Sequence, residues 1–283
     1  MSDLESVKKL RNSTGAGFKD CNQALKESGG NLEKAIEILR IKGVSKASKK
    51  MSREANEGLV SIFGDEKKSS IIEINCETDF VAKNDDFLNF VDEISELNHS
   101  VNSDQDKLKN TKMKNGKIVS ENLVSLISKI GEKITIGRSK TLDSNNGKNY
   151  TYNHTIIRNK LSKLAVIVSL EMDKQTKEID SFGKQLSMHI AASNPLVIES
   201  QNLKDEIIAK EKDIIDKELK ETGKPQEILE KIAQGKLNKF KDENSLLSQF
   251  WVMDPKKKVK DILNEFRKSN IKIKDFYRIK IGE

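Results

Sequence analysis

The stretch INCETDFVAKNDDF, residues 74–87, passes from a segment typical of a β-strand into a segment typical of a helix. Phe80 stands on the connection beside polar Thr78 and Asp79, where neither the strand alternation nor the helical period buries it. One interpretation is a hydrophobic staple, in which Phe80 folds back onto Phe87. The other is a wedge that a partner protein buries, because burial of a Phe contributes roughly 1.5–3 kcal/mol and such anchors dominate interfaces. The residues alone leave both interpretations open.

The segments around this connection alternate between strand and helix patterns. The expected elements are strands at 59–63 and 70–76 that form a hairpin across GDEKK, helices at 87–94 and 123–130, and a strand at 133–142. Residues 98–117 are polar, and we expect a loop there. The same order then recurs, with strands at 150–157 and 164–172 before a helix at 181–193. A strand–strand–helix unit that occurs twice suggests a duplication.

The two ends of this core have helical patterns. Residues 2–43 predict three short helices, the second ended by Gly29-Gly30 and the third by Gly43. Residues 44–57 are polar and basic and predict a linker with helical tendency. Near the C-terminus, Asp254 and Pro255 predict the start of a helix, and an alternating strand follows at 271–281.

Residues 203–240 predict two charged helices with a sharp stop at TGKP. Ile207 and Ile214, and likewise Ile208 and Ile215, are seven residues apart, which is typical of a coiled-coil seam. The apolar residues expected on the return helix are Ile228, Leu229, Ile232 and Ala233. The sequence therefore predicts an antiparallel helical hairpin with a narrow apolar seam.

The composition is polar and basic. The 283 residues carry a formal charge of +7, with 35% hydrophobic and 34% charged residues. Nucleic acid is an obvious candidate partner for such a chain, but only seven of its 51 basic residues are Arg, which nucleic-acid readers favour. We therefore expect most of this charge to solvate the surface, and nucleic-acid binding to be unlikely.

No set of residues for catalysis is evident. Motifs for a phosphate-binding P-loop, a nucleophile elbow and a zinc-binding H-E-x-x-H are absent from the sequence. Cys21 and Cys76 are expected as small core residues, and His189 as a packed or capping residue. We therefore expect no enzyme activity, no cofactor, no metal and no direct nucleotide binding. Signal-peptide and membrane-span patterns are also absent, and reduced cysteines fit a cytoplasmic protein.

Two longer motifs resemble the signatures of the bacterial elongation factor Ts family: LRNSTGAGFKDCNQAL at 10–25 and EINCETDFVAK at 73–83. Further similar segments follow in the family's order, namely MHIAAS (188–193), TGKP (222–225) and FWVMDPKKKV (250–259). The resemblance covers essentially the whole chain. It implies an α+β protein with a ubiquitin-associated-like three-helix module, a core of two related α+β subdomains, an antiparallel helical hairpin (coiled coil) and a C-terminal helical module. The corresponding boundaries are 1–54, 55–142, 143–202 with 237–255, 203–236, and 256–283.

The resemblance also implies a function and a partner. Family members are guanine-nucleotide exchange factors that bind elongation factor Tu in its GDP form and its nucleotide-free form. Thr78, Asp79, Phe80 and Val81 match the stretch that displaces magnesium, with Phe80 as the wedge. The other positions that match partner contacts are Arg11, Phe18 and Lys19 in the N-terminal module, and His154 in the second subdomain.

Other classes of function stay open at this point. One is a basic RNA-binding scaffold, and another is an interaction protein that acts through the hairpin at 203–240. An enzyme is the least favoured class, because the sequence offers no catalytic set.

Overall fold

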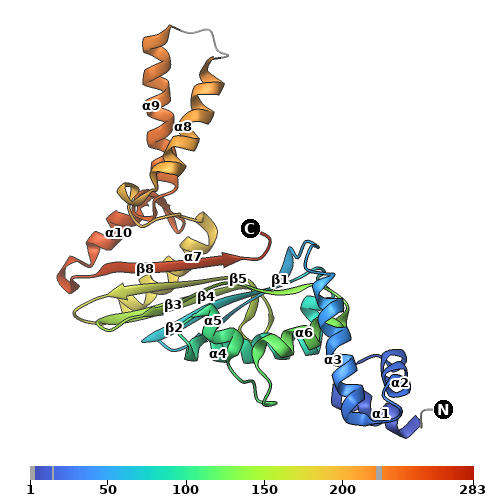
Figure 1. The fold of residues 1–283 in the computed structure, drawn as a ribbon. Helices are drawn as coiled ribbons and strands as arrows, with labels where there is room; N and C mark the ends of the chain where they lie inside the picture. The colour runs from blue at the N-terminus through green and yellow to red at the C-terminus, as the bar shows by residue number, and fades with distance from the viewer. Residues whose placement is uncertain (1–3, 15, 221–224) are drawn as a thin grey trace.

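The computed structural model describes residues 4–14, 16–220 and 225–283, and it shows a chain of mixed helix and sheet (Figure 1). The helices are α1 (Leu4–Thr14), α2 (Phe18–Glu27), α3 (Leu32–Ser48), α4 (Asp85–Ser100), α5 (Gln105–Asn110), α6 (Val119–Ile130), α7 (Lys177–Ser193), α8 (Asp205–Lys220), α9 (Gln226–Glu243) and α10 (Val259–Glu265). The strands are β1 (Glu57–Gly64), β2 (Lys68–Cys76), β3 (Ile134–Asp143), β4 (Gly147–Arg158), β5 (Leu161–Glu171), β6 (Phe250–Trp251), β7 (Asp254–Lys258) and β8 (Lys272–Lys280). Short 3₁₀ turns are η1 (Val81–Lys83), η2 (Ser200–Asn202), η3 (Leu246–Ser248) and η4 (Arg267–Ser269). The α+β class expected from the sequence is confirmed.

The central sheet is antiparallel, with the order β3-β2-β1-β5-β4 and with β8 also paired to β5. β5 pairs with β1 only at Leu161 and Ser162, and it pairs with β8 from Leu164 onward. Because β5 changes partner along its length, the sheet has two halves. The buried side chains that join the halves all lie on strands: Val60, Ile62, Ile71, Leu142, Ala165, Ile167 and Ile279.

Each half of the sheet has its own helical cover. The opposite faces of β1 and β2 contribute Leu59, Ile72 and Ile74 to a core with α4 and α6. The opposite face of β5 contributes Val166 and Val168 to a core with α7. Strand alternation therefore gives β1, β2 and β5 two buried faces, and the strand–strand–helix order predicted for both halves is present.

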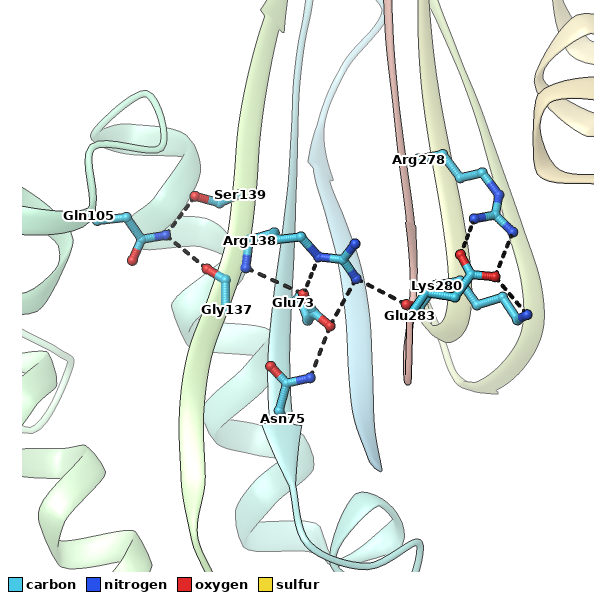
Figure 2. A network of polar contacts seen from close by, with 9 residues as sticks. All are labelled: Glu73, Asn75, Gln105, Gly137, Arg138, Ser139, Arg278, Lys280 and Glu283. Carbon is cyan, nitrogen blue, oxygen red and sulfur yellow. Dashed lines mark hydrogen bonds and ion pairs between the residues drawn. The ribbon is translucent and has the colours of Figure 1, made fainter. Parts of the chain in front are cut away.

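An ion pair between the buried Glu73 and the exposed Arg138 ties the β3 edge to the C-terminal strand (Figure 2). Glu73 is 5% exposed, and its carboxylate accepts two bonds from the Arg138 guanidinium, from Nε at 2.7 Å and from Nη2 at 3.2 Å. Arg138 Nη2 also donates to the Lys280 carbonyl oxygen at 3.0 Å. Burial raises the pKa of Glu73, but hydrogen bonds from Arg138 and Asn75 outweigh it and lower the pKa overall. The fork geometry of Arg thus holds β2, β3 and β8 together.

The N-terminal helices pack around a small core that includes Val7, Leu10, Cys21, Leu25 and Leu39, as the sequence predicts. Asn31 caps α3, since its side chain accepts from the Lys34 N–H at 3.0 Å. Gly15, between α1 and α2, lies outside the described residues.

The prediction that Gly43 ends the third helix is wrong. α3 continues to Ser48, and the expected linker at 44–57 therefore begins as helix. The physical reason is tertiary packing, because Gly43 lies against Ser128 of α6 and Ala47 joins the core beneath it. Arg40 also pairs with Glu121, so the long helix fastens the N-terminal module to the sheet domain.

Three other predictions are corrected by the structure. The expected loop at 98–117 contains α5, which Asp104 caps and whose Leu108 is fully buried. Asp254 and Pro255 do not start a helix but lie in β7, where Asp254 pairs with Trp251. The 256–283 segment, expected as a helical module, contains α10 and then β8, which completes the sheet.

The predicted helical hairpin is present and projects away from the sheet on the side opposite α4, α5 and α6 (Figure 1). Its seam is narrow: Ile215 and Leu219 are the buried residues of α8, whereas none of the described residues of α9 is buried. Ile214 and Ile228 are 51% and 47% exposed, so those two do not belong to the seam. Of the expected TGKP stop, only Pro225 lies within the described residues.

His189 is packed at the base of this hairpin, as predicted. Its Nδ1 accepts from the Val252 N–H at 3.3 Å, so Nε2 carries the proton and donates to Gln249 Oε1 at 3.0 Å. Gln249 Nε2 donates in turn to the carbonyl oxygens of Ser193 and Glu243. One neutral imidazole thus connects the ends of α7 and α9 to the β6–β7 turn.

Acid should loosen this junction. Burial lowers the pKa of His189, although its hydrogen bond to Gln249 raises it. A group with a lowered folded pKa contributes stability that is present above its unfolded pKa of about 6.5 and is lost as the pH falls. The free energy of unfolding should therefore decrease between about pH 7.5 and about pH 5.5. Fluorescence of Trp251, the single tryptophan, reports this unfolding from a ring 5.1 Å away.

The variant His189→Gln has no ring to titrate there. It should be less stable than the wild type near neutral pH, yet lose less stability on acidification. Met188→Gln is the matched control, because Met188 is 42% exposed on the same helix and its replacement keeps the imidazole. If the free energy of unfolding decreased as steeply with acidification in His189→Gln as in the wild type, this account would be contradicted.

Candidate partner-binding site

The connection between β2 and α4 exposes Phe80. β2 ends at Cys76, η1 covers Val81–Lys83, and α4 begins at Asp85 after the capping residue Asn84. Between these elements the Phe80 side chain is 80% exposed, which is the largest exposed fraction among the large apolar residues that the structure describes. Phe87 is fully buried in the core beneath α4, and Phe80 is not part of that core. The staple interpretation is therefore wrong for the free protein.

Residues on both sides of Phe80 hold it in this place. Val81 and Ala82, which follow it, are 7% and 1% exposed and belong to the core. Before it, the Thr78 N–H and hydroxyl donate to the two oxygens of Glu132, at 3.1 and 2.9 Å. The Thr78 carbonyl oxygen accepts from the Ala82 N–H at 3.3 Å and closes the turn. The backbone is thus fixed at both ends of an exposed ring.

A second contact braces the same loop from the opposite direction. Glu77 Oε1 accepts from the Lys133 N–H at 2.5 Å, and Arg53 Nη1 lies 3.3 Å from Glu77 Oε2. Glu77-Thr78 and Glu132-Lys133 therefore hold one another through reciprocal hydrogen bonds. The bond from Lys133 lowers the pKa of Glu77, with a smaller lowering from Arg53. The carboxylate is thus ionised and ready to accept at neutral pH.

The charges beside Phe80 are paired and exposed. Lys83 Nζ donates to Asp79 Oδ2 at 2.8 Å, four residues away. This bond lowers the pKa of Asp79 and raises the pKa of Lys83, so both groups are charged at neutral pH. Exposed ion pairs contribute only about 0–1 kcal/mol. Asp79 can therefore exchange Lys83 for another partner at little cost.

The three residues predicted in the N-terminal module lie far from Phe80. Arg11 is on α1, and Phe18 and Lys19 begin α2. All three are exposed, and Phe18 is 45% exposed. Figure 1 shows α1 and α2 beside the end of α3 that lies away from the sheet. The structure thus places these residues and Phe80 on separate elements of the chain.

His154 lies on β4, opposite Leu164 of β5. It is exposed, and its Nδ1 lies 2.9 Å from the Tyr152 hydroxyl. Ile156, two residues further on, is 58% exposed and was not singled out from the sequence. A signal was present in the adjacent Ile156 and Ile157, because neighbouring residues of a strand point to opposite faces.

The described part of the chain offers few groups for chemistry. It contains no group of three or more His, Cys, Asp or Glu placed to hold a metal ion. Burial raises the pKa of the Cys76 thiol to about 12, which makes it a poor nucleophile. In the same described residues, no helix is long and apolar enough to cross a membrane. The features that distinguish this surface are an exposed ring, paired charges and a rigid backbone.

These features define an α+β protein whose candidate site is a protein-contact surface. Comparison with known proteins gives its family. The family model described as Elongation factor TS matches residues 77–283, more than half of the chain. Similar curated relatives, all named Elongation factor Ts, come from Rhizorhabdus wittichii (40% identity over 98% of this chain and 92% of the relative), Clostridium kluyveri (40%, 100% and 94%) and Gluconobacter oxydans (35%, 98% and 91%).

The chain belongs to the elongation factor Ts family. It is therefore an elongation factor of protein biosynthesis, and the family implies nucleotide exchange on elongation factor Tu. The resemblance found in the two sequence motifs is confirmed.

The exposure of Phe80 predicts that the free protein tolerates its loss. Phe80→Ala should change the free energy of unfolding by less than about 0.5 kcal/mol, because the ring contacts mostly water. Phe87→Ala, the matched control seven residues away, should cost about 3–5 kcal/mol, because it empties a core site. Urea unfolding of both variants measures the difference. A loss of similar size in the two variants would show that Phe80 is packed in the free protein.

Proposed function

We propose that this protein releases GDP from elongation factor Tu by inserting Phe80 between helices of the nucleotide-binding domain and displacing magnesium. The observation that supports this most is the exposed Phe80 ring on a connection fixed by Thr78, Glu132 and the buried Val81. A mobile loop would lose conformational freedom on binding, whereas this one is ordered beforehand. Exposure and rigidity together are what a wedge requires.

The mechanism follows from differential binding. A partner can shift an equilibrium only by the difference between its affinities for the two states. Phe80 gains its burial only where the partner's helices have parted, so it favours the nucleotide-free form over the GDP form. The coupling is reciprocal, since GDP or GTP weakens the binding of this protein by the same free energy. The protein therefore binds both the GDP form and the nucleotide-free form, with tighter binding to the latter.

Asp79 and its neighbours act on the metal in this proposal. Asp79 is ionised and paired only with exposed Lys83 among the described ion pairs. When Phe80 enters the partner, Asp79 moves with it into the neighbourhood of the magnesium site. There the charge of Asp79 competes for the groups that orient the magnesium ion. Thr78 and Val81 maintain the conformation of the loop.

Other parts of the chain supply affinity. We assign Arg11, Phe18 and Lys19 of the ubiquitin-associated-like module (1–54), and His154 of the second core subdomain (143–202 with 237–255), as further contacts. The remaining proposed units are the first core subdomain (55–142), the hairpin (203–236) and the C-terminal module (256–283). Within the described residues Arg11 forms no ion pair, so its charge is available to a partner.

The wedge predicts a loss of rate. At saturating concentration, Phe80→Ala should release labelled GDP from elongation factor Tu at least about tenfold more slowly, because the lost burial of roughly 1.5–3 kcal/mol is realised only in the opened state. Stopped-flow fluorescence measures the rate. Phe250→Ala, another exposed Phe (62%), is the matched control and should be much less affected. An unchanged rate in Phe80→Ala would exclude the wedge.

Substitutions in the N-terminal module should instead lower the affinity for elongation factor Tu. Arg11→Ala combined with Phe18→Ala should raise the concentration for half-maximal exchange by about threefold to tenfold, with the saturated rate preserved. Point substitutions are preferable to deletion, because α3 also packs on α6. Lys9→Ala, on another face of α1, is the control. A reduced saturated rate at unchanged half-maximal concentration would contradict this assignment.

A further inference from the structure

The end of the β4–β5 hairpin carries an exposed apolar residue that the proposal above does not use. Three consecutive residues of β4, His154, Thr155 and Ile156, are exposed, with Ile156 at 58%. Thr155 has a φ of 55°, in the left-handed region that β-branched residues rarely adopt. Backbone strain of this kind persists only where the surrounding structure holds it, and it is often found at binding sites.

Arg158 holds this hairpin end against α4. Its Nη2 donates to Asp92 Oδ2 at 2.8 Å and to Asn89 Oδ1 at 3.0 Å, and its Nη1 lies 3.6 Å from Asp85 Oδ1. Residues 85, 89 and 92 lie on one face of a helix over two turns. The planar guanidinium therefore lies along the first turns of α4, and Ile157 packs against the core beneath it. A compact ammonium could not span these three acceptors.

Both strands of this hairpin contact segments that adjoin Phe80. Asp85, which faces Arg158, is five residues after Phe80 and begins the helix that follows it. On β5, Lys163 Nζ lies 2.5 Å from Glu57 Oε2. Glu57 pairs across the sheet with Cys76, the last residue of β2 before the connection, so Lys163 lies near it. The hairpin end and Phe80 therefore lie together at the N-terminal end of α4.

We propose that Ile156 is a second anchor for elongation factor Tu, the partner that receives Phe80. We also propose that Arg158 is a positioning residue that fixes Ile156 relative to Phe80. This inference rests on the proposed function. The occupant is the same partner, because the hairpin end continues the surface around Phe80 and is fastened to the same helix. An exposed apolar side chain preceded by the polar, exposed His154 and Thr155 has the composition of an interface centre with its rim. Two anchors on one rigid frame also lose less freedom on binding than anchors on independent segments.

The test measures GDP release from elongation factor Tu against the concentration of the full-length protein. Ile156→Ala should raise the half-maximal concentration by about fivefold to tenfold, and its saturated rate should stay within about twofold of the wild type. Its midpoint of thermal unfolding should change by less than about 2 °C, because the side chain is mostly exposed. An unchanged half-maximal concentration in Ile156→Ala, with slow release in Phe80→Ala, would overturn the second anchor and leave the proposed function standing. No stimulated release by the wild type would overturn both.

A double-mutant cycle tests the positioning role. Arg158→Ala should also raise the half-maximal concentration, and Ile156→Ala should then add less than about twofold in that background. Asp92→Asn weakens the same contact from α4 and should act in the same direction if Arg158→Ala folds poorly. Arg158→Lys should recover only part of the loss. Lys160→Ala is the matched control, because Lys160 is exposed in the same turn and should behave as the wild type. Effects of Arg158→Ala and Ile156→Ala that simply multiply would overturn the positioning role.

Discussion

The exposure of Phe80 depends on the reciprocal hydrogen bonds between two loops. Thr78 donates twice to Glu132, and Lys133 donates to Glu77, so the start of the β2–α4 connection is fixed to the segment between α6 and β3. The buried Val81 and Ala82 fix its other end. Because both ends of the connection are fixed, the backbone keeps the Phe80 ring outside the core that contains Phe87. An apolar side chain thus stays in water because its neighbours are well bonded, and its burial remains available to a partner.

The rest of the architecture can be understood as a frame around this connection. The Glu73–Arg138 pair and β8 join the two halves of the sheet, and Arg158 fastens the β4–β5 hairpin to the helix after Phe80. α3 carries Arg11 and Phe18 to one end of the molecule, and the neutral His189 organises the base of the projecting hairpin at another. In the proposed mechanism, contacts that supply affinity are spread along the chain, whereas distortion of the partner is assigned to one rigid point. Such a division would let a protein accelerate nucleotide release through binding energy alone.

Much of this structure could be predicted from the sequence, and the failures share a cause. Strongly periodic segments correctly predicted the strands of the central sheet, the helix that contains Phe87 and the burial of His189. α5 was missed because Leu108 is its only buried residue, and β7 was missed because its charged DPKKK sequence is a strand only through pairing with β6. Gly43 did not end α3, because α6 packs against it.

The exposure of Phe80 could not be predicted from its neighbours in the sequence, since Glu132, which holds the loop, is 54 residues from Thr78. The role of Arg158 depends on acceptors more than 60 residues away. Local pattern predicts elements, but long-range contacts decide which side chain is left exposed.

The central claim is that the Phe80 ring is in water in the free protein and enters the partner only when the nucleotide leaves. Fluorine NMR on a protein with para-fluorophenylalanine at position 80 tests this directly, through the solvent isotope shift of the fluorine signal. The account predicts a solvent-exposed signal in the free protein, a protected signal with nucleotide-free elongation factor Tu, and the return of the exposed signal when GDP is added in excess. A signal that is already protected in the free protein, or that stays exposed with the nucleotide-free partner, would contradict the account.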